Sequence, residues 1–105
     1  MKNKILTLII PAKNESESLP IVLNSLKKFN YNIIVSLNKN DHETINSINN
    51  YENVQILKQS AKGYGNALIE GINECKTKYF CIYNADGSFD AVSYTHLTLP
   101  TKRIL

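Results

Sequence analysis

The sequence lacks an apolar run long enough to cross a membrane or to form the core of a secretory signal peptide. Its first apolar stretch, residues 5–10, is interrupted by Thr7 and ends at Pro11. A signal peptide needs an apolar core of about 7–15 residues, and a membrane-spanning helix needs about 20. We therefore expect a cytoplasmic protein, with the cytoplasmic face of a membrane as the alternative for the full-length protein.

Cysteine is also scarce, and basic residues are not concentrated. Cys75 and Cys81 have neither the close spacing nor the histidine partners of a zinc site, so both are expected to be buried and reduced. Residues 1–91 contain ten Lys against nine Asp or Glu, and the lysines are scattered along the chain. Without a basic stripe, nucleic acid is not an expected partner.

Two nucleotide-binding motifs are missing as well. No glycine-rich loop ends in Gly-Lys-Ser or Gly-Lys-Thr, and no Gly-x-Gly-x-x-Gly follows the first apolar run. These absences argue against a P-loop nucleotidase and against an NAD-binding domain.

Composition changes abruptly after residue 91. The first 91 residues contain fourteen Asn, whereas residues 92–105 contain none and have three Thr. Residues 92–101 resemble the translation of a transposon-end adapter used in sequencing libraries. We therefore expect a truncated native domain at 1–91 and a non-native, adapter-like tail at 92–105 that does not pack on the native sheet.

Strand-like and helix-like patterns alternate along the native part. Short apolar runs at 5–10, 33–37, 54–58 and 79–83 suit buried strands. Helical spacing of apolar residues occurs at 19–29, at 45–48 behind the capping residue Asp41, and at 64–75, where Gly71 is expected to allow close packing on the sheet. This order predicts a doubly wound α/β fold, a Rossmann-like parallel sheet with strand order 3-2-1-4.

Four polar loops are predicted to meet beyond the carboxyl ends of these strands, where such sheets bind ligands: residues 12–15, 38–41, 59–63 and 84–88. Asp86 can supply an oxygen ligand to Mg²⁺ or Mn²⁺, with Asp90 a weaker candidate; a simple Asp-Gly-Ser turn is the alternative. Lys62 and Gly63 precede a helix, where free N–H groups attract a diphosphate, although a lysine at such a position is more often simply a solvated side chain. Glu15 can accept hydrogen bonds from ribose or a base, or can favour the start of the first helix by its charge.

Three segments together resemble family-2 glycosyltransferases of GT-A fold: residues 9–15 (IIPAKNE), 62–72 (KGYGNALIEGI) and 85–90 (ADGSFD). The nearest likeness is to the dolichyl-phosphate and polyprenyl-phosphate sugar synthases. The resemblance implies inverting transfer of a sugar from a nucleotide diphosphate donor to a lipid-phosphate or glycan acceptor, with a divalent cation. It places the turn at 11–15 beside the nucleoside, Lys62 and Gly63 near the diphosphate, and Asp86 at the metal-binding second acid of an Asp-x-Asp motif.

The sequence departs from that family's motifs at two places. Asn84 replaces the first acid of Asp-x-Asp, and the usual Asp-Asp-Gly-Ser after the second strand is replaced by residues 37–41, so that either Asn38 or Asp41 contacts the base. The resemblance implies a general base that we expect beyond the last residue of this chain, so no residue here matches it and none is predicted to be catalytic. The residues expected to bind the nucleotide sugar are Pro11, Ala12, Glu15, Asn38, Asp41, Lys62, Gly63, Asn84, Ala85 and Asp86.

Other functions fit the sequence less well. A sugar-nucleotide nucleotidyltransferase would need a Gly-rich loop bearing Arg and Lys after the first strand, where this chain has residues 11–15. A receiver-like signalling domain would need an acidic pair after the first strand and an Asp after the third, where Lys58, Gln59 and Ser60 stand. A non-catalytic α/β binding domain is the remaining alternative.

Overall fold

Parallel strands form the centre of the molecule. A computed structural model describes residues 6–29, 31–85 and 103–104. The strands are β1 (Leu6–Pro11), β2 (Asn32–Asn38), β3 (Val54–Gln59), β4 (Tyr79–Ile82) and β5 (Arg103–Ile104). Their order in the sheet is β3-β2-β1-β4-β5, and every neighbouring pair is parallel. The predicted order 3-2-1-4 and the α/β class are thus confirmed.

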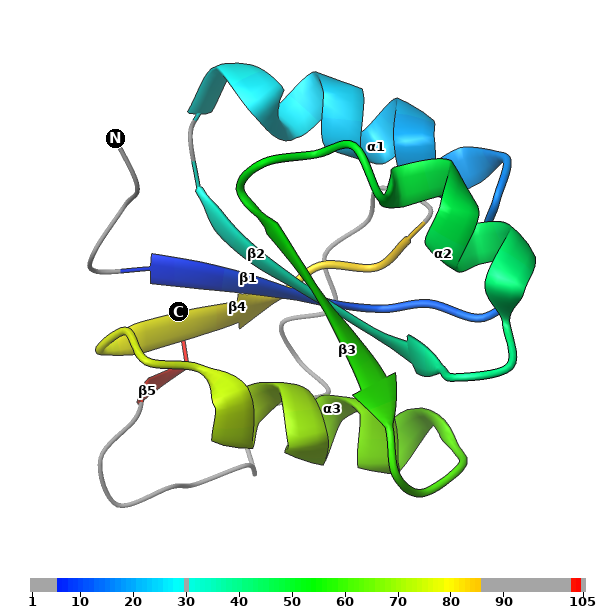
Figure 1. Ribbon diagram of the computed structural model, residues 1–105. Helices are drawn as coiled ribbons and strands as arrows, with labels where there is room; N and C mark the ends of the chain where they lie inside the picture. The colour runs from blue at the N-terminus through cyan, green and yellow to red at the C-terminus, as the bar shows by residue number, and fades with distance from the viewer. Residues whose placement is uncertain (1–5, 30, 86–102, 105) are drawn as a thin grey trace.

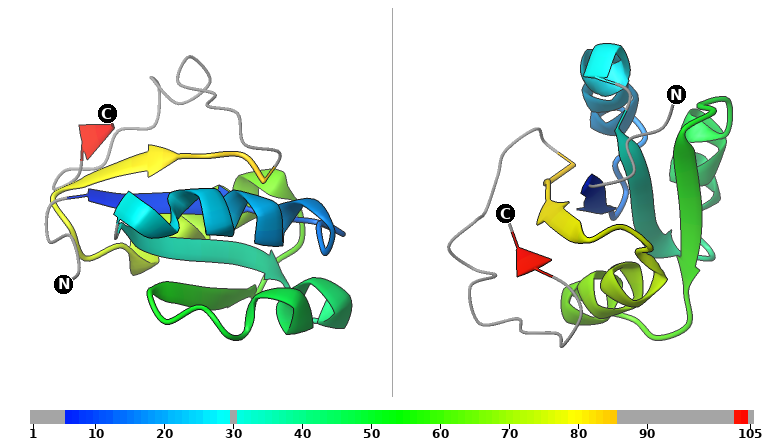
Figure 2. Two further views of the ribbon diagram at one scale, coloured as in Figure 1. Left: turned by 90° about the horizontal axis from the view of Figure 1, so that it is seen from above. Right: turned by 90° about the vertical axis from the view of Figure 1, so that its left-hand side faces the viewer.

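Helices cover both faces of this sheet (Figures 1 and 2). The first helix, α1 (Ser18–Leu26), continues into a 3₁₀ turn, η1 (Lys27–Phe29), and α2 (His42–Ile48) lies on the same face. The opposite face carries α3 (Tyr64–Glu74). No helix among the residues placed by the structure is long and apolar enough to span a bilayer.

Alternation along the strands divides the core into two layers. On β1, Leu8 and Ile10 pack toward α1 and α2, whereas Ile9 packs toward α3. All three side chains are at most 3% exposed, as expected for a strand covered on both sides. The continuous apolar runs in the sequence therefore reflect burial on both faces of the sheet.

Gly71 brings α3 unusually close to the sheet. A Cβ atom at this position would lie 2.7 Å from Ile9 Cγ2 and 2.9 Å from Ser36 Oγ. Ser36 is fully buried, and its hydroxyl has no hydrogen-bond partner among the residues that the structure describes. The expectation that Gly71 allows close packing is confirmed.

Two expectations need adjustment. Cys75 is buried, but Cys81 is only half-buried; both are free thiols, and burial raises the pKa of Cys81. The tail was expected not to pack on the sheet, yet Arg103 and Ile104 pair with Tyr79 and Phe80 of β4. The reason is that β4 would otherwise present open backbone groups, which another extended segment can satisfy whatever its composition. Whether 92–105 is foreign to the protein stays a prediction.

Candidate functional site

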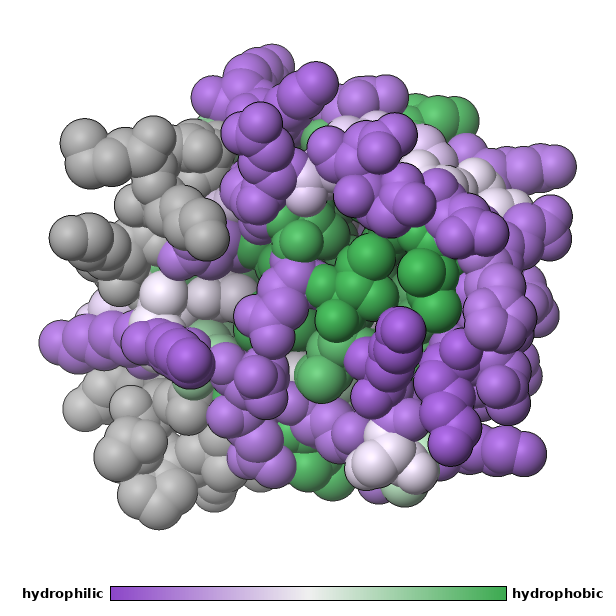
Figure 3. Space-filling view, viewed as in Figure 1, coloured by the Kyte–Doolittle hydropathy of each residue, from purple (hydrophilic) through white to green (hydrophobic). Residues whose placement is uncertain are grey.

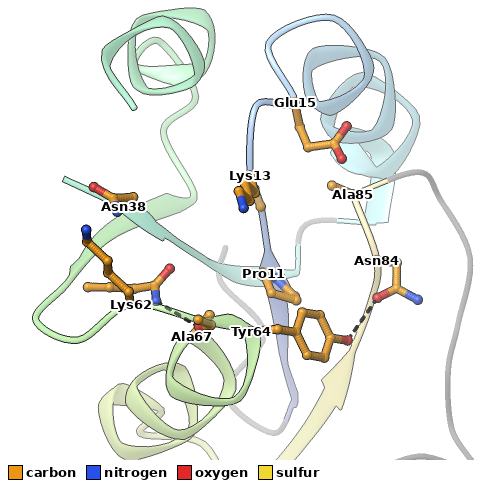
Figure 4. A pocket seen from close by; sticks show the side chains of 12 residues that line it. Pro11, Lys13, Glu15, Asn38, Lys62, Tyr64, Ala67, Asn84 and Ala85 are labelled. Atoms are coloured by element: carbon orange, nitrogen blue, oxygen red, sulfur yellow. Dashed lines mark hydrogen bonds between the residues drawn. The ribbon is translucent and has the colours of Figure 1, made fainter. Parts of the chain in front are cut away.

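A cavity of about 470 Å³ opens at the carboxyl ends of the strands (Figure 4). It lies between the chain that follows β1, the ends of β2 and β3, the start of α3 and the chain that follows β4. The residues that line it are Pro11, Ala12, Lys13, Glu15, Asn38, Gln59, Lys62, Gly63, Tyr64, Ala67, Asn84 and Ala85. Eight of the ten residues predicted from the sequence belong to this set, so the structure brings them together; whether they bind a nucleotide sugar stays a prediction.

The loop after β1 is fixed by the start of α2. Asn14 adopts a left-handed conformation with φ 54°, which asparagine tolerates better than most residues. Its N–H donates to Asp41 Oδ2 at 2.9 Å, and the N–H of Glu15 donates to Thr44 Oγ1 at 3.1 Å. The Glu15 carboxylate accepts a hydrogen bond from the Ser18 hydroxyl. The backbone around Glu15 is therefore anchored before any ligand arrives.

Asp41 has a different place from the one expected. It does not line the cavity; its Oδ1 instead caps α2 by accepting from Thr44 N at 3.4 Å. Burial raises the pKa of Asp41, but hydrogen bonds from Asn14 and Thr44 and the nearby His42 outweigh this effect, so the pKa lies below its ordinary value. Both carboxylate oxygens are engaged within the protein, whereas Asn38 faces the cavity.

The loop between β3 and α3 is held from both ends. The Glu70 carboxylate on α3 accepts from Ser60 N at 2.9 Å and from Ala61 N at 3.1 Å, and these bonds lower the pKa of Glu70. The Gln59 amide donates to Ala61 O at 2.9 Å and to Gly63 O at 3.1 Å. Gly63 has φ 105°, a conformation that strongly favours glycine, and so starts α3 at the cavity wall.

Tyr64 joins α3 to the chain that follows β4. This residue opens α3, and its hydroxyl donates to Asn84 Oδ1 at 3.3 Å, as the dashed line in Figure 4 shows. Pro11 lies beside the ring in the same view. The aromatic ring therefore bridges two of the segments that line the cavity.

The charges around the cavity favour an anion. Lys13 and Lys62 line it from two different loops, and among the lining residues Glu15 is the one carboxylate. Lys62 also stands just before α3, and the start of a helix attracts negative charge through its backbone N–H groups and its dipole. A phosphate-bearing ligand fits this distribution better than a cation or an apolar molecule.

Four lining residues were missed by the sequence analysis: Lys13, Gln59, Tyr64 and Ala67. Lys13 and Gln59 lie within the predicted loops, so their position at the carboxyl ends of strands could have identified them as lining residues. Tyr64 and Ala67 are one turn apart at the start of α3, and the sequence analysis treated this helix only as packing on the sheet; Tyr64 is 52% exposed.

The metal prediction is not tested by the geometry, because Asp86 and Asp90 lie outside the described residues. Ala85, the residue before Asp86, is buried and lines the cavity. Within residues 6–29, 31–85 and 103–104, no three Asp, Glu, His or Cys side chains gather as a metal site would need.

Comparison with known proteins agrees with the motifs. The model of the family described as glycosyl transferase family 2 matches residues 7–97. Uncharacterized glycosyltransferases of Mycobacterium bovis and Mycobacterium tuberculosis are 30% identical to this chain over 91 residues. The match covers 87% of this chain and 41% of each relative. The chain thus spans about two-fifths of the length of these relatives.

Proposed function

Because the chain belongs to glycosyl transferase family 2, we propose that its cavity binds the nucleoside diphosphate part of an activated sugar. One observation carries the proposal: Lys13 and Lys62 line the same cavity at the carboxyl ends of the strands and at the start of α3. Parallel α/β sheets bind their ligands at this edge, and helix starts bind phosphate.

The lining residues divide into two groups in this proposal. Lys62 and the backbone at Gly63 hold the diphosphate, and Lys13 adds a second positive charge. Glu15 accepts hydrogen bonds from the ribose hydroxyls, and its anchored backbone reduces the ordering needed on binding. Asn38 contacts the base in preference to Asp41, because both oxygens of Asp41 are already engaged.

A divalent cation, Mg²⁺ or Mn²⁺, is part of the same proposal. Asp86 would hold it together with diphosphate oxygens, since these cations prefer oxygen ligands and commonly bind through one or two carboxylates plus phosphate. When bound, the cation would stabilise negative charge on the departing diphosphate. Lys62 contributes to the same stabilisation from the protein side.

The full-length protein is proposed to transfer the sugar with inversion to a hydroxyl or phosphate of an acceptor, either a polyprenyl phosphate or a glycan. Attack by a hydroxyl requires a general base to take its proton. Glu15, the one carboxylate among the lining residues, is not assigned this role, because it is proposed to contact the ribose. Donor binding is thus the part of the reaction that this chain can be tested for.

Calorimetry with nucleoside diphosphates tests the proposal. Lys62→Ala should weaken binding about tenfold or more, since a hydrogen bond to a charged group contributes about 1.5–3 kcal/mol. Lys58→Ala is the matched control, because Lys58 is exposed and lies outside the cavity lining. Mn²⁺ should strengthen binding to the wild type but not to Asp86→Ala. Equal affinities for the Lys62 and Lys58 variants would refute the diphosphate site.

A further inference from the structure

The loop between β3 and α3 carries Lys62 and Gly63, which are proposed to hold the diphosphate. Residues 60–63 are all exposed to solvent, so burial does not fix their conformation. An exposed segment samples many conformations unless hydrogen bonds restrict it, and each residue that a ligand has to order weakens binding. The position of Lys62 in the ligand-free protein therefore depends on the polar contacts of this loop.

Glu70 on α3 supplies three of these contacts. Its Oε1 accepts from Ser60 N at 2.9 Å and from the Ser60 hydroxyl at 3.1 Å, and its Oε2 accepts from Ala61 N at 3.1 Å. The bonds from the Ser60 and Ala61 N–H groups lower the pKa of Glu70, so the side chain is ionised at neutral pH. Hydrogen bonds to an ionised carboxylate are stronger than those between neutral groups.

Side-chain amides hold the remainder of the loop. Gln59 Nε2 donates to Ala61 O and Gly63 O, and Asn66 Nδ2 donates to Lys62 O at 2.7 Å. All of these contacts are made to the backbone, and none of them uses the Lys62 ammonium group. The network therefore orders the loop without using the charge of the lysine that lines the cavity.

We propose that Glu70 is a positioning residue for the diphosphate: its carboxylate holds the loop in the conformation that presents Lys62 and the Gly63 backbone to the phosphates. Glu70 does not itself line the cavity and acts through the loop. This inference rests on the proposed function, because it assumes that a diphosphate occupies the cavity. A loop that is already ordered loses less conformational entropy when the ligand binds.

Neutralising Glu70 distinguishes this role from a simple effect of charge. Removing a negative charge near an anion site should, by electrostatics alone, strengthen the binding of a diphosphate. If the carboxylate holds the loop, Glu70→Gln should instead weaken binding, because an amide has one acceptor oxygen and cannot replace both oxygens of the carboxylate. We expect a loss of about fivefold or more, which corresponds to the ordering of about one loop residue.

Glu74→Gln is the matched control. Glu74 lies one turn later on α3, is exposed, and carries the same charge as Glu70. It accepts a hydrogen bond from Gln55 Nε2 at 3.3 Å, away from the loop. The same loss of charge at Glu74 should therefore leave the affinity for a diphosphate unchanged or slightly higher.

Titration calorimetry of the 105-residue chain and both variants provides the test, with the four ribonucleoside diphosphates and inorganic pyrophosphate as ligands. Glu70→Gln should weaken pyrophosphate and the tightest-binding nucleoside diphosphate by the same factor, because the loop faces the phosphates. In a Lys62→Ala background, Glu70→Gln should cost less, since the side chain that it positions is gone. A general loss of stability would give the same factor in both backgrounds.

Amide hydrogen exchange in the ligand-free wild type tests the loop without a variant. The N–H groups of Ser60 and Ala61 should exchange slowly although both residues are exposed, because Glu70 accepts from them. Exchange at the rate of an unfolded chain would overturn the inference whether or not the variants fold.

The outcomes separate the two proposals. If nucleoside diphosphates bind the wild type and Lys62→Ala weakens them, but Glu70→Gln behaves like Glu74→Gln, the diphosphate site stands and the inference about Glu70 is wrong. An equal cost of Glu70→Gln with and without Lys62 also overturns the inference. If none of the diphosphates binds the wild type, both the inference and the proposed function are wrong.

Discussion

Gly71 lies where α3 touches the sheet, and it offers a direct test of the packing at single-residue scale. Gly71→Ala would place a methyl group 2.7 Å from Ile9 Cγ2 and 2.9 Å from Ser36 Oγ. Overpacking a tight core costs about 1–3 kcal/mol, which exceeds the gain of up to about 1 kcal/mol from alanine's helix propensity. We expect a lower free energy of unfolding, measured by urea denaturation.

Gly65 provides the control for this prediction. It lies in the same helix, and a methyl group there would meet nothing within 4 Å. Gly65→Ala should therefore stabilise the protein by up to about 1 kcal/mol through helix propensity alone. If both alanine variants change stability in the same direction, the close approach of α3 at Gly71 is not a constraint on the fold.

Single residues also show where sequence reasoning reaches its limit. Lys62, Gly63 and Glu15 could be placed at the cavity because they follow strands or precede a helix, and strand ends meet at one edge of a parallel sheet. The choice between Asn38 and Asp41 could not be made, because it depends on which side chain is taken up by another loop. The contact from Asn14 to Asp41 spans 27 positions of sequence and has no local signature.

At the scale of elements, α2 is short, but it organises the site. Its capping residue Asp41 was recognisable from the sequence, as were the strands and the strand order, because apolar periodicity and caps are local signals. The sequence did not indicate that the first turn of α2 also holds the loop at Asn14 and Glu15. That role depends on how α1 and α2 pack together on one face of the sheet.

Replacing the capping residue Asp41 should destabilise α2 and should also weaken its hold on the loop at Asn14. Asn has one acceptor oxygen, so Asp41→Asn cannot accept from both Asn14 N and Thr44 N with full strength. We expect the free energy of unfolding to fall by about 1 kcal/mol at pH 7, as is usual when a cap or a hydrogen bond is lost. Glu43→Gln is the control, because Glu43 is an exposed carboxylate in the first turn of the same helix.

Asp41 should also make the stability of the protein depend on pH. The pKa of Asp41 is lowered in the folded protein from its ordinary value of 3.8. Its contribution is therefore present above that value and is lost as the pH falls through the lowered pKa. The free energy of unfolding can be measured by urea denaturation at pH 7 and near pH 3. The difference between these two values should be smaller for Asp41→Asn than for the wild type. An unchanged difference would mean that Asp41 does not couple folding to pH.

At the scale of the whole molecule, the two edges of the sheet are unlike each other. On one side β3 is the outer strand, and its apolar side chains Val54, Ile56 and Leu57 are half-buried. Apolar surface is visible on this side of the molecule, where β3 faces the viewer (Figure 3). The exposed Gln55 and Lys58 interrupt it, and a charged or polar residue on an edge strand discourages pairing with another chain.

On the other side β4 is followed in the sheet by β5, whose pairing involves only Arg103 and Ile104 among the described residues. So short a pairing adds little to stability, since each residue that is ordered also loses conformational entropy. Among the residues that the structure describes, those that line the cavity all lie between positions 11 and 85. Removing residues 92–105 is therefore expected to leave both the core and the ligand site in place.

Calorimetry of a chain ending at residue 91 should accordingly give a thermal midpoint within about 2 °C of the 105-residue chain and the same affinity for nucleoside diphosphates. Deletion of residues 103–105 alone is the control, because it removes β5 and keeps positions 92–102. A fall of about 4 °C or more in both chains would show that β5 is a stabilising strand. A fall confined to the longer deletion would locate the stabilising contacts within 92–102, and either result would contradict the prediction that this segment is dispensable.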